Sequence, residues 1–327
     1  MKVKKSKDDL IITGGKISVT AQDQGLYGQD CVKIKDGTFA LNTQGDAIQS
    51  DNAEDATKGF VYVADGSFTI ETQGDAFQAE TLLQTDGGTF NLTTGGGSEN
   101  GITHTDRDRG GWAPMGVPRS DESPSTGAPT ALTASTEDET ASAKGFKAIS
   151  TGDDGLHADS DLKITGGTLV IAKSYEGLEE NTITLTGGII DVTASDDGVN
   201  VAGGNDGSSL GRLGQNNFDA NQSEKYLKIS GGDITVNASG DGLDYNGTAT
   251  ITGGVFLSTG SSGMAQGFAT ESTQSSLLYN LTTTVSAGRK VTLTDSNGKE
   301  ILNWTAKKDF SSIQLSSPDL VQGSNYT

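Results

Sequence analysis

The sequence has little of what several common protein classes need. It contains one cysteine, so an internal disulfide framework is excluded. With only two histidines and no Cys/His cluster, a zinc site of the usual structural type is not expected. Five prolines are too few for a collagen-like or polyproline chain. No apolar run is long enough for a membrane-spanning helix, so we expect no membrane span.

Basic and apolar residues are also scarce. The 23 lysines and arginines face 43 acidic residues, which gives a formal net charge of -20. Because nucleic-acid binding depends on basic surface that displaces counterions, nucleic acid is not an expected partner. An acidic surface suits cations, or serves only solubility. Hydrophobic residues make up 32% and aromatic residues 6%, beside 46 glycines, which favours many short strands and turns over helices.

What the sequence does contain is a repeat with a period of about 22 residues, which is typical of a solenoid. One short motif occurs three times in the middle of the chain, with variations: Asp153-Asp154-Gly155-Leu156-His157, Tyr175-Glu176-Gly177-Leu178-Glu179 and Asp196-Asp197-Gly198-Val199-Asn200.

Apolar residues alternate on both sides of each glycine pair. Leu162 and Ile164 precede the pair at 166–167, and Leu169 and Ile171 follow it. Alternation with a period of two predicts strands with one buried face. Each repeat adds a third short strand, whereas no segment shows a sustained helical period. The sequence therefore predicts an all-β, right-handed parallel β-helix with three short strands per turn of about 22 residues.

Two interruptions and a terminal hairpin pattern divide the chain. The first interruption is rich in Gly, Ser, Thr, Asp and Pro and predicts an irregular insertion, either a lid or a floppy segment. The predicted parts are N-terminal β-helix turns at 1–94, the insertion at 95–144, C-terminal turns at 145–263 with a loop at 203–225, and a C-terminal β cap at 264–327.

Acidic residues recur at equivalent positions of the C-terminal turns. Equivalent positions of a parallel β-helix lie about 4.8 Å apart, and two carboxylates at that distance repel by roughly 3 kcal/mol at an effective dielectric constant of 20. Since Leu156 and Ala158 face inward, we expect His157 and its equivalents to face outward. Calcium, which takes six to eight oxygen ligands, would relieve the repulsion. The predicted ligands are Asp153, Asp154, Glu176, Glu179, Asp196, Asp197, Asn200, Asp241 and Asp244.

A second interpretation of these residues stays open. Asp-Gly is common turn chemistry, and an aspartate can bond to its own backbone without any metal.

The repeated motifs resemble those of the β-helix family of carbohydrate-binding domain-containing proteins. Two further segments share this resemblance: Gly240-Asp241-Gly242-Leu243-Asp244 and Ser316-Ser317-Pro318-Asp319-Leu320. The likeness spans most of residues 8–327, leaves out the insertion at 95–144, and is strong from about residue 144 onward. That family is similar to pectate-lyase-type polysaccharide lyases. The resemblance implies a bacterial cell surface, bound calcium, and binding of cellulose or polygalacturonate.

We therefore expect a non-catalytic, calcium-dependent carbohydrate-binding protein that is extracellular and monomeric. The residues expected to contact the glycan are Tyr175, His157, Arg212 and Lys173. No signal peptide follows the basic start of the chain, which predicts that the chain lacks its export signal through truncation.

Two alternatives belong to other functional classes. A polysaccharide lyase needs a strong base near the acidic residues. The candidates Lys147, Lys163, Lys173 and Arg212 are not in register with the acidic columns, and Lys163 is expected on a different sheet. The other alternative is a structural or adhesive scaffold, a common role of solenoids.

Overall fold

The computed structural model describes residues 4–95, 154–201 and 225–327. Apart from their end residues Gly95 and Lys225, the predicted insertion at 95–144 and the loop at 203–225 lie outside the described residues. Asp153 and Arg212, predicted as a metal ligand and a glycan contact, lie outside them as well.

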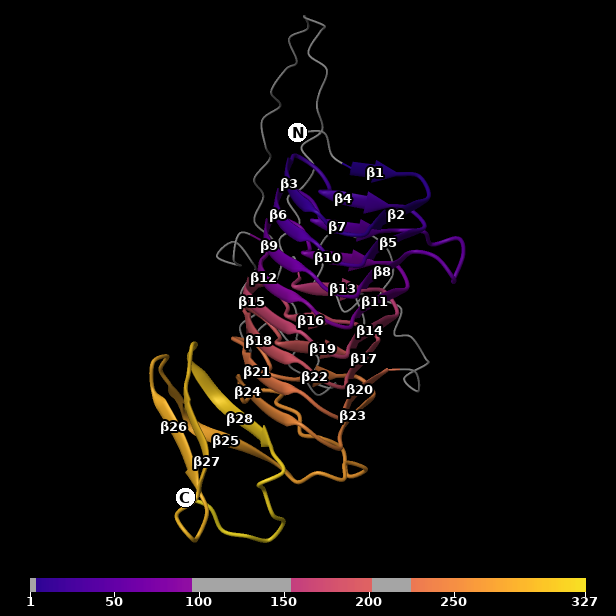
Figure 1. The fold of residues 1–327 in the computed structure, drawn as a ribbon. Helices are drawn as coiled ribbons and strands as arrows, with labels where there is room; N and C mark the ends of the chain where they lie inside the picture. Colours follow the sequence, from indigo (N-terminus) through magenta and orange to yellow (C-terminus); the bar gives the residue numbers. More distant parts are fainter. Residues whose placement is uncertain (1–3, 96–153, 202–224) are drawn as a thin grey trace, which may run out of the picture. The chain divides into compact units, whose positions relative to one another are not determined.

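The described residues form three parallel sheets that the chain visits in rotation (Figure 1). Sheet A contains β1 (Lys4–Ser6), β4 (Leu26–Gly28), β7 (Ile48–Ser50), β10 (Phe77–Ala79), β13 (Leu156–Ala158), β16 (Leu178–Glu179), β19 (Val199–Val201) and β22 (Asp244–Tyr245). Sheet B contains β2 (Asp9–Ile12), β5 (Cys31–Ile34), β8 (Phe60–Val63), β11 (Leu82–Thr85), β14 (Asp161–Ile164), β17 (Thr182–Leu185), β20 (Tyr226–Ile229) and β23 (Thr248–Ile251).

Sheet C has longer strands and continues into the C-terminal part. Its parallel strands are β3 (Lys16–Ala21), β6 (Thr38–Thr43), β9 (Ser67–Thr72), β12 (Thr89–Thr93), β15 (Thr168–Ser174), β18 (Ile189–Ala194), β21 (Asp233–Asn237) and β24 (Val255–Gly260). Because every third strand returns to the same sheet, the fold is a parallel β-helix, and the prediction from sequence is confirmed.

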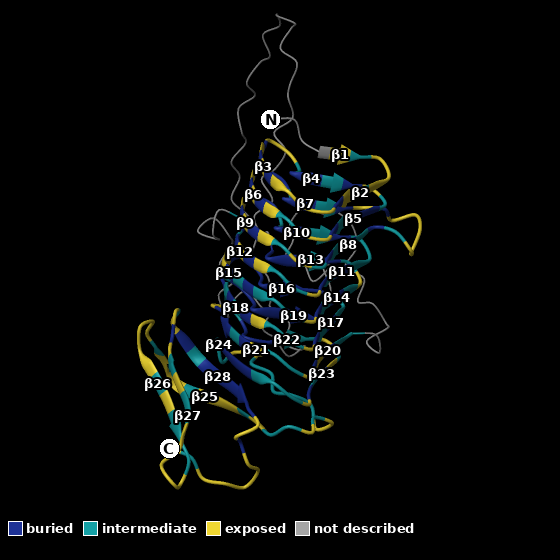
Figure 2. Ribbon diagram, in the orientation of Figure 1, coloured by how far each residue is buried: buried dark blue, intermediate teal, exposed yellow. Residues whose placement is uncertain are grey.

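The core lies between the three sheets, where the inward side chains of successive turns stack on one another. In sheet B, Val61, Leu83, Leu162 and Ile183 occupy the same register position on four successive strands, and all are buried. The inward positions of the β-helix strands are the dark blue bands of Figure 2. The alternation that predicted one buried face per strand is therefore the pattern of core packing.

Aromatic residues reinforce the N-terminal half of this core. The rings of Phe39, Phe68 and Phe90 stack face to face, with centroids 4.5 and 4.7 Å apart along the column. Phe77 meets two of these rings edge-on, at 5.7 Å. Like side chains therefore lie above like side chains, which holds the turns in register.

The paired glycines mark the corner between sheets B and C. Gly188 has φ of 95°, a conformation that side-chain-bearing residues rarely adopt. A Cβ atom at this position would also lie 3.1 Å from the carbonyl oxygen of Gly167 on the turn before. The corner thus requires glycine for its backbone angle and for the close approach of neighbouring turns.

The C-terminal part is a small antiparallel unit. β28 (Phe310–Ser316) pairs with both β24 and β25 (Ser276–Val285), which extends sheet C. β26 (Lys290–Thr294) and β27 (Glu300–Thr305) form the hairpin expected from sequence. Within the described residues there is no helix long and apolar enough to cross a membrane.

Candidate functional site

The acidic residues before the sheet A strands form one column, as predicted. Backbone hydrogen bonds place Glu176, Asp197 and Asp241 on successive turns after Asp154. Aspartate side chains in the column also accept a hydrogen bond from the backbone N–H of the next turn. These bonds are Asp75 N to Asp46 Oδ1 at 3.1 Å, Asp154 N to Asp75 Oδ1 at 2.7 Å, Glu176 N to Asp154 Oδ1 at 3.1 Å, and Asp241 N to Asp197 Oδ1 at 2.6 Å.

This ladder changes the electrostatic argument made from sequence. A carboxylate that accepts backbone N–H bonds is stabilised in its charged form without a counter-ion. The aspartates bond to the backbone of the next turn, a variant of the metal-free interpretation, in which they bond to their own. Repulsion alone is therefore a weaker argument for calcium at Asp46, Asp75 and Asp154 than the sequence indicated. At Asp197, by contrast, burial and the charge of Asp196 outweigh the backbone hydrogen bond and raise the pKa.

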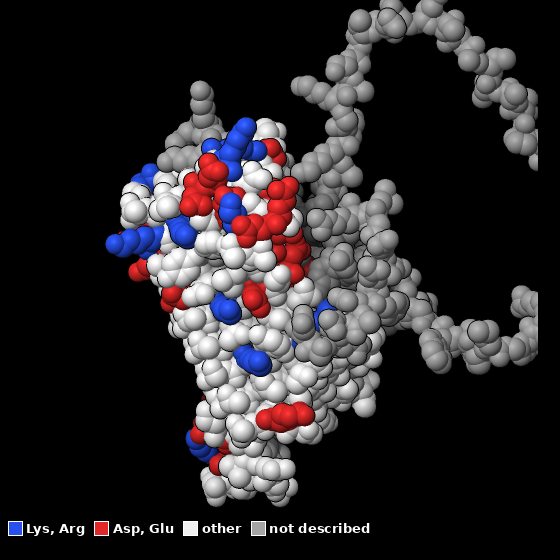
Figure 3. Space-filling view, turned by 90° about the vertical axis from the view of Figure 1, so that its right-hand side faces the viewer, with Lys and Arg blue, Asp and Glu red and all other residues white. Residues whose placement is uncertain are grey.

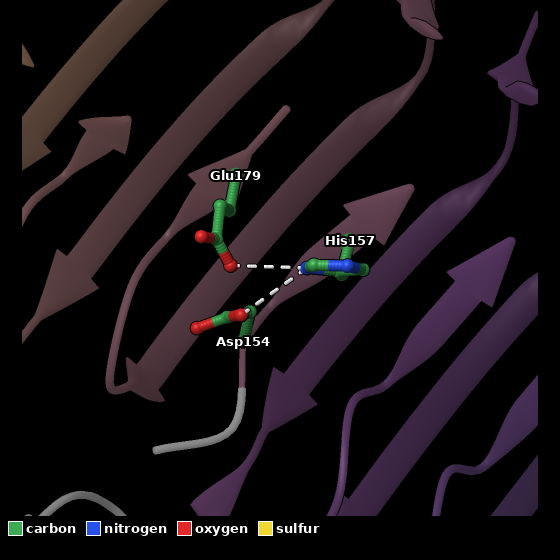
Figure 4. A group of neighbouring side chains, drawn as sticks. All are labelled: Asp154, His157 and Glu179. Carbon is green, nitrogen blue, oxygen red and sulfur yellow. Dashed lines mark hydrogen bonds and ion pairs between the residues drawn. The ribbon is translucent and has the colours of Figure 1, made fainter. Parts of the chain in front are cut away.

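One group of side chains stands out from the column. Asp154 lies immediately before the turn into β13, His157 lies on β13, and Glu179 lies opposite His157 on β16. The three side chains point toward one another (Figure 4). His157 Nδ1 is 3.0 Å from Glu179 Oε2 and 3.5 Å from Asp154 Oδ2. One ligand atom of each residue lies within 4.8 Å of the others, so the group could hold a metal ion.

The imidazole of His157 lies among carboxylates on three sides. Besides Asp154 and Glu179, Asp159 Oδ1 is 3.2 Å from its Nε2 atom. Burial by itself would lower the pKa of His157, but the hydrogen bonds to these carboxylates raise the pKa well above its ordinary value. His157 therefore carries a positive charge at neutral pH when no metal is bound.

The protonation states of Asp154 and Glu179 depend on each other. Burial and the charge of Asp154 raise the pKa of Glu179 to about 8. Burial also acts to raise the pKa of Asp154, yet hydrogen bonds from His157 and Glu179 bring it below its ordinary value. The two groups therefore titrate as a coupled pair, in which Glu179 holds a proton more strongly than Asp154 does.

One oxygen of this group has no internal partner. The side chain of Glu179 is 2% exposed, and its Oε1 atom makes no hydrogen bond within the part of the chain that the structure describes. Most buried polar atoms are satisfied, so an unsatisfied one indicates a missing water or ion. The donor set fits a divalent cation at this place.

Two other predicted calcium ligands form a hydrogen bond with each other. Asn200 Nδ2 donates to Glu176 Oε2 at 2.6 Å, and both side chains are fully buried. Burial and the charge of Asp196 raise the pKa of Asp197 well above its ordinary value. The structure therefore brings Asp154 and Glu179 together with His157, while Asn200 and Glu176 satisfy each other one turn further along.

Several expected orientations need correction. His157, Glu179, Asn200 and Asp244 share the outward register, as expected, but Glu179 and Asn200 are buried. Tyr175, expected to stack on a sugar, is 4% exposed, and its hydroxyl donates to Asp196 Oδ2 at 2.8 Å. A ring with this burial packs inside the turn and presents no face to a sugar.

Lys173, also expected to contact the glycan, is exposed at a register shift in β15. It therefore belongs to sheet C, whereas the Asp154–His157–Glu179 group belongs to sheet A. The two predictions do not describe one site on the same sheet.

The sequence interpretation missed two residues near this group. Asp159 follows the last residue of β13 and was not in the repeated motif. Glu180 stands two residues after Leu178, the position that Ala158 and Val201 take in the neighbouring turns of the repeat, and it is completely buried. A glutamate at an inward position of the repeat was the signal that could have revealed it.

The comparisons with known proteins agree with the resemblance seen in the motifs. A family model described as carbohydrate-binding domain-containing protein matches residues 3–198, more than half of the chain, including Asp154, His157 and Glu179. The match does not reach residues 199–327, although the motif likeness was expected to be strong from about residue 144 onward. No curated protein and no solved structure matches the chain. The chain belongs to the family of carbohydrate-binding domain-containing proteins.

Proposed function

We propose that this protein is a non-catalytic, calcium-dependent module that binds an acidic polysaccharide outside the bacterial cell. Membership of the carbohydrate-binding family supports the ligand class. The observation that carries the metal is the buried Asp154–Glu179 pair, in which Glu179 Oε1 has no hydrogen-bond partner.

Asp154 and Glu179 would hold the ion through their carboxylate oxygens. Calcium accepts irregular sets of oxygen ligands, so it suits a site with few protein carboxylates. When bound, it would offer its remaining positions to the carboxylates of a uronic-acid chain. His157 offers a nitrogen, which favours zinc, so zinc is the second candidate ion.

The surroundings of the group support binding over catalysis. β-Elimination beside a uronate needs a strong base as well as a charge neutraliser. Among the described residues, no lysine or arginine pairs with Asp154 or Glu179, whose only cationic neighbour is His157. Lys163 lies on sheet B, as the sequence predicted.

Binding to polygalacturonate should weaken about tenfold when calcium is removed by a chelator, a change that corresponds to about 1.4 kcal/mol. Affinity electrophoresis and isothermal titration calorimetry with calcium, zinc or EDTA would measure it. Glu179→Gln should abolish the calcium effect, whereas Glu271→Gln, a matched change at an exposed glutamate, should leave it unchanged. Equal affinity for polygalacturonate in calcium and EDTA would refute calcium dependence, and no binding to any polysaccharide would refute the function.

Metal affinity should also rise with pH. The ion must displace the proton that Glu179 holds with a pKa of about 8, so the affinity for calcium should increase about tenfold per pH unit from pH 6 to pH 8 and then level off. Calorimetric titration of calcium at four pH values would measure this slope. A flat profile would mean that Glu179 is not a ligand.

A further inference from the structure

The outward face of sheet B carries a column of side chains that the proposed calcium site does not use. Each strand of sheet B places one outward residue at the same register position, near the middle of the strand. We call these residues the lysine column, which consists of Ile11, Lys33, Tyr62, Gln84, Lys163, Thr184, Lys228 and Thr250.

Among the described residues, the lysines of this column have no acidic partner within ion-pair distance, although the chain has a net charge of -20. Elsewhere, lysines form ion pairs of 2.5 to 3.0 Å with neighbouring aspartates, as Lys5, Lys58, Lys299 and Lys307 do. Across the described strands, Lys33, Lys163 and Lys228 form no ion pair. Their charges are therefore available to a ligand.

Aromatic rings hold two of these ammonium groups. Lys33 Nζ lies 4.9 Å from the ring centroid of Phe60, and Lys228 Nζ lies 3.8 Å from that of Tyr226. A cation over an aromatic ring is attracted to it but keeps its charge and its hydrogen-bond donors. The rings thus position these lysines without neutralising them.

The middle of the column is fixed by one aspartate. Tyr62 Oη donates to Asp86 Oδ2 at 2.7 Å, and Gln84 Nε2 donates to Asp86 Oδ1 at 2.8 Å. Thr165 Oγ1 donates to the same carboxylate at 2.9 Å. Three donors spread the charge of Asp86, and its bonds hold Tyr62 and Gln84 in place between Lys33 and Lys163. A site whose side chains are already ordered loses less entropy on binding.

Figure 3 presents the side of the molecule on which sheet B lies. In the middle of that view, separate lysine or arginine side chains stand on a surface that is mostly uncharged, while acidic side chains gather mainly in its upper part.

We infer that the lysine column is a calcium-independent binding site for an extended uronic-acid polysaccharide. Strands in a sheet are about 4.8 Å apart, so Lys33 and Lys163 are separated by about 14 Å and Lys163 and Lys228 by about 10 Å along the column. A polymer with a carboxylate on every sugar can meet all three lysines while it follows the column. The inference rests on the proposed function for the ligand being a glycan, but it assigns that glycan to a different sheet from the calcium site.

Other occupants fit this face less well. A neutral glycan would leave three unpaired ammonium groups without a charged partner. Nucleic acid would meet only these few cations on a strongly acidic protein, and its affinity depends on many phosphate contacts.

The test uses polygalacturonate in the presence of EDTA, which removes the calcium contribution. The triple variant Lys33→Gln, Lys163→Gln, Lys228→Gln should bind about tenfold more weakly than the unaltered protein, because each exposed ion pair contributes modestly. The matched control Lys7→Gln, Lys16→Gln, Lys290→Gln changes the net charge equally at exposed lysines outside the column and should leave the affinity unchanged. Thermal melting would verify that both variants fold.

The outcomes separate this inference from the proposed function. If the unaltered protein binds polygalacturonate and the column variant binds equally well, or both triple variants weaken equally, the lysine column is not the site. If polyglutamate binds as tightly as polygalacturonate and is equally weakened, the column recognises any polyanion and the assignment to a uronic-acid chain is wrong. If the unaltered protein binds no polysaccharide with or without calcium, the proposed function itself fails.

Discussion

Replacing His157 with alanine should destabilise the folded protein by about 3 kcal/mol near pH 6, because removal of one partner leaves buried charge uncompensated. The imidazolium lies between Asp154, Asp159 and Glu179, and of these Asp154 is buried and ionised. Chemical denaturation at several pH values would measure the loss.

The pH dependence of this loss follows from the directions of the two pKa shifts. The raised pKa of His157 contributes stability that is complete below about pH 6.5 and is lost as pH rises through the folded-state pKa. The lowered pKa of Asp154 contributes stability that is complete above about pH 4 and is lost as pH falls through its folded-state pKa. The difference between the proteins should therefore be largest between about pH 4 and pH 6.5.

Calcium should restore much of the lost stability, since the ion supplies the missing positive charge beside Asp154. Millimolar calcium should raise the melting temperature of His157→Ala more than that of the unaltered protein. Gln78→Ala is a matched control, because Gln78 precedes His157 in the same column and is uncharged. If calcium raised the melting temperatures of His157→Ala and Gln78→Ala equally, or raised neither, the group around His157 would not be the metal site.

Glu180→Met should stabilise the protein by about 2 kcal/mol at neutral pH, because it removes a buried polar group without hydrogen bonds. Glu180 is completely buried, and neither carboxyl oxygen has a hydrogen-bond partner. The equivalent residues in the neighbouring turns of the repeat are Ala158 and Val201, so an apolar side chain suits the site.

The stabilisation gained by Glu180→Met should increase with pH. Burial, with a smaller effect from the charges of Asp159 and Glu179, raises the pKa of Glu180 well above its ordinary value, against the opposing charge of His157. A raised pKa in the folded state contributes stability that is complete below about pH 4.3 and is lost as pH rises through the folded-state pKa. The Glu180→Met variant has no carboxyl group at this position, so its stability does not fall with pH for this reason.

Denaturation from pH 4 to pH 9 would test the expectation for Glu180. Glu180→Gln should remove the pH dependence but give a smaller gain, since the amide is also polar and buried. A methionine variant that is less stable than the unaltered protein, or that no longer binds calcium, would show that Glu180 has a partner when the protein functions.

The β-helix could be predicted from the amino-acid sequence alone. Its period, its alternating apolar residues and its glycine pairs, such as the one ending at Gly188, specify where each strand runs and which face it buries. These signals are local and repeat every turn, so residues such as Leu162 and Ile183 fall into register once one turn is aligned. The same alignment placed Asp154, Glu176 and Asp197 in one column.

The hydrogen bonds and protonation of those acidic groups, by contrast, follow from the packing of adjacent turns in the folded protein. Whether a carboxylate bonds to the backbone of the next turn, as Asp154 does, or holds a proton, as Glu179 does, depends on its burial and its neighbours on adjacent turns. The same holds for Lys163, which the sequence placed on another sheet but could not show to lack an acidic partner among the described residues. Register follows from a repeating pattern of small and apolar residues, whereas charge state depends on distances and solvent exposure that no repeat encodes.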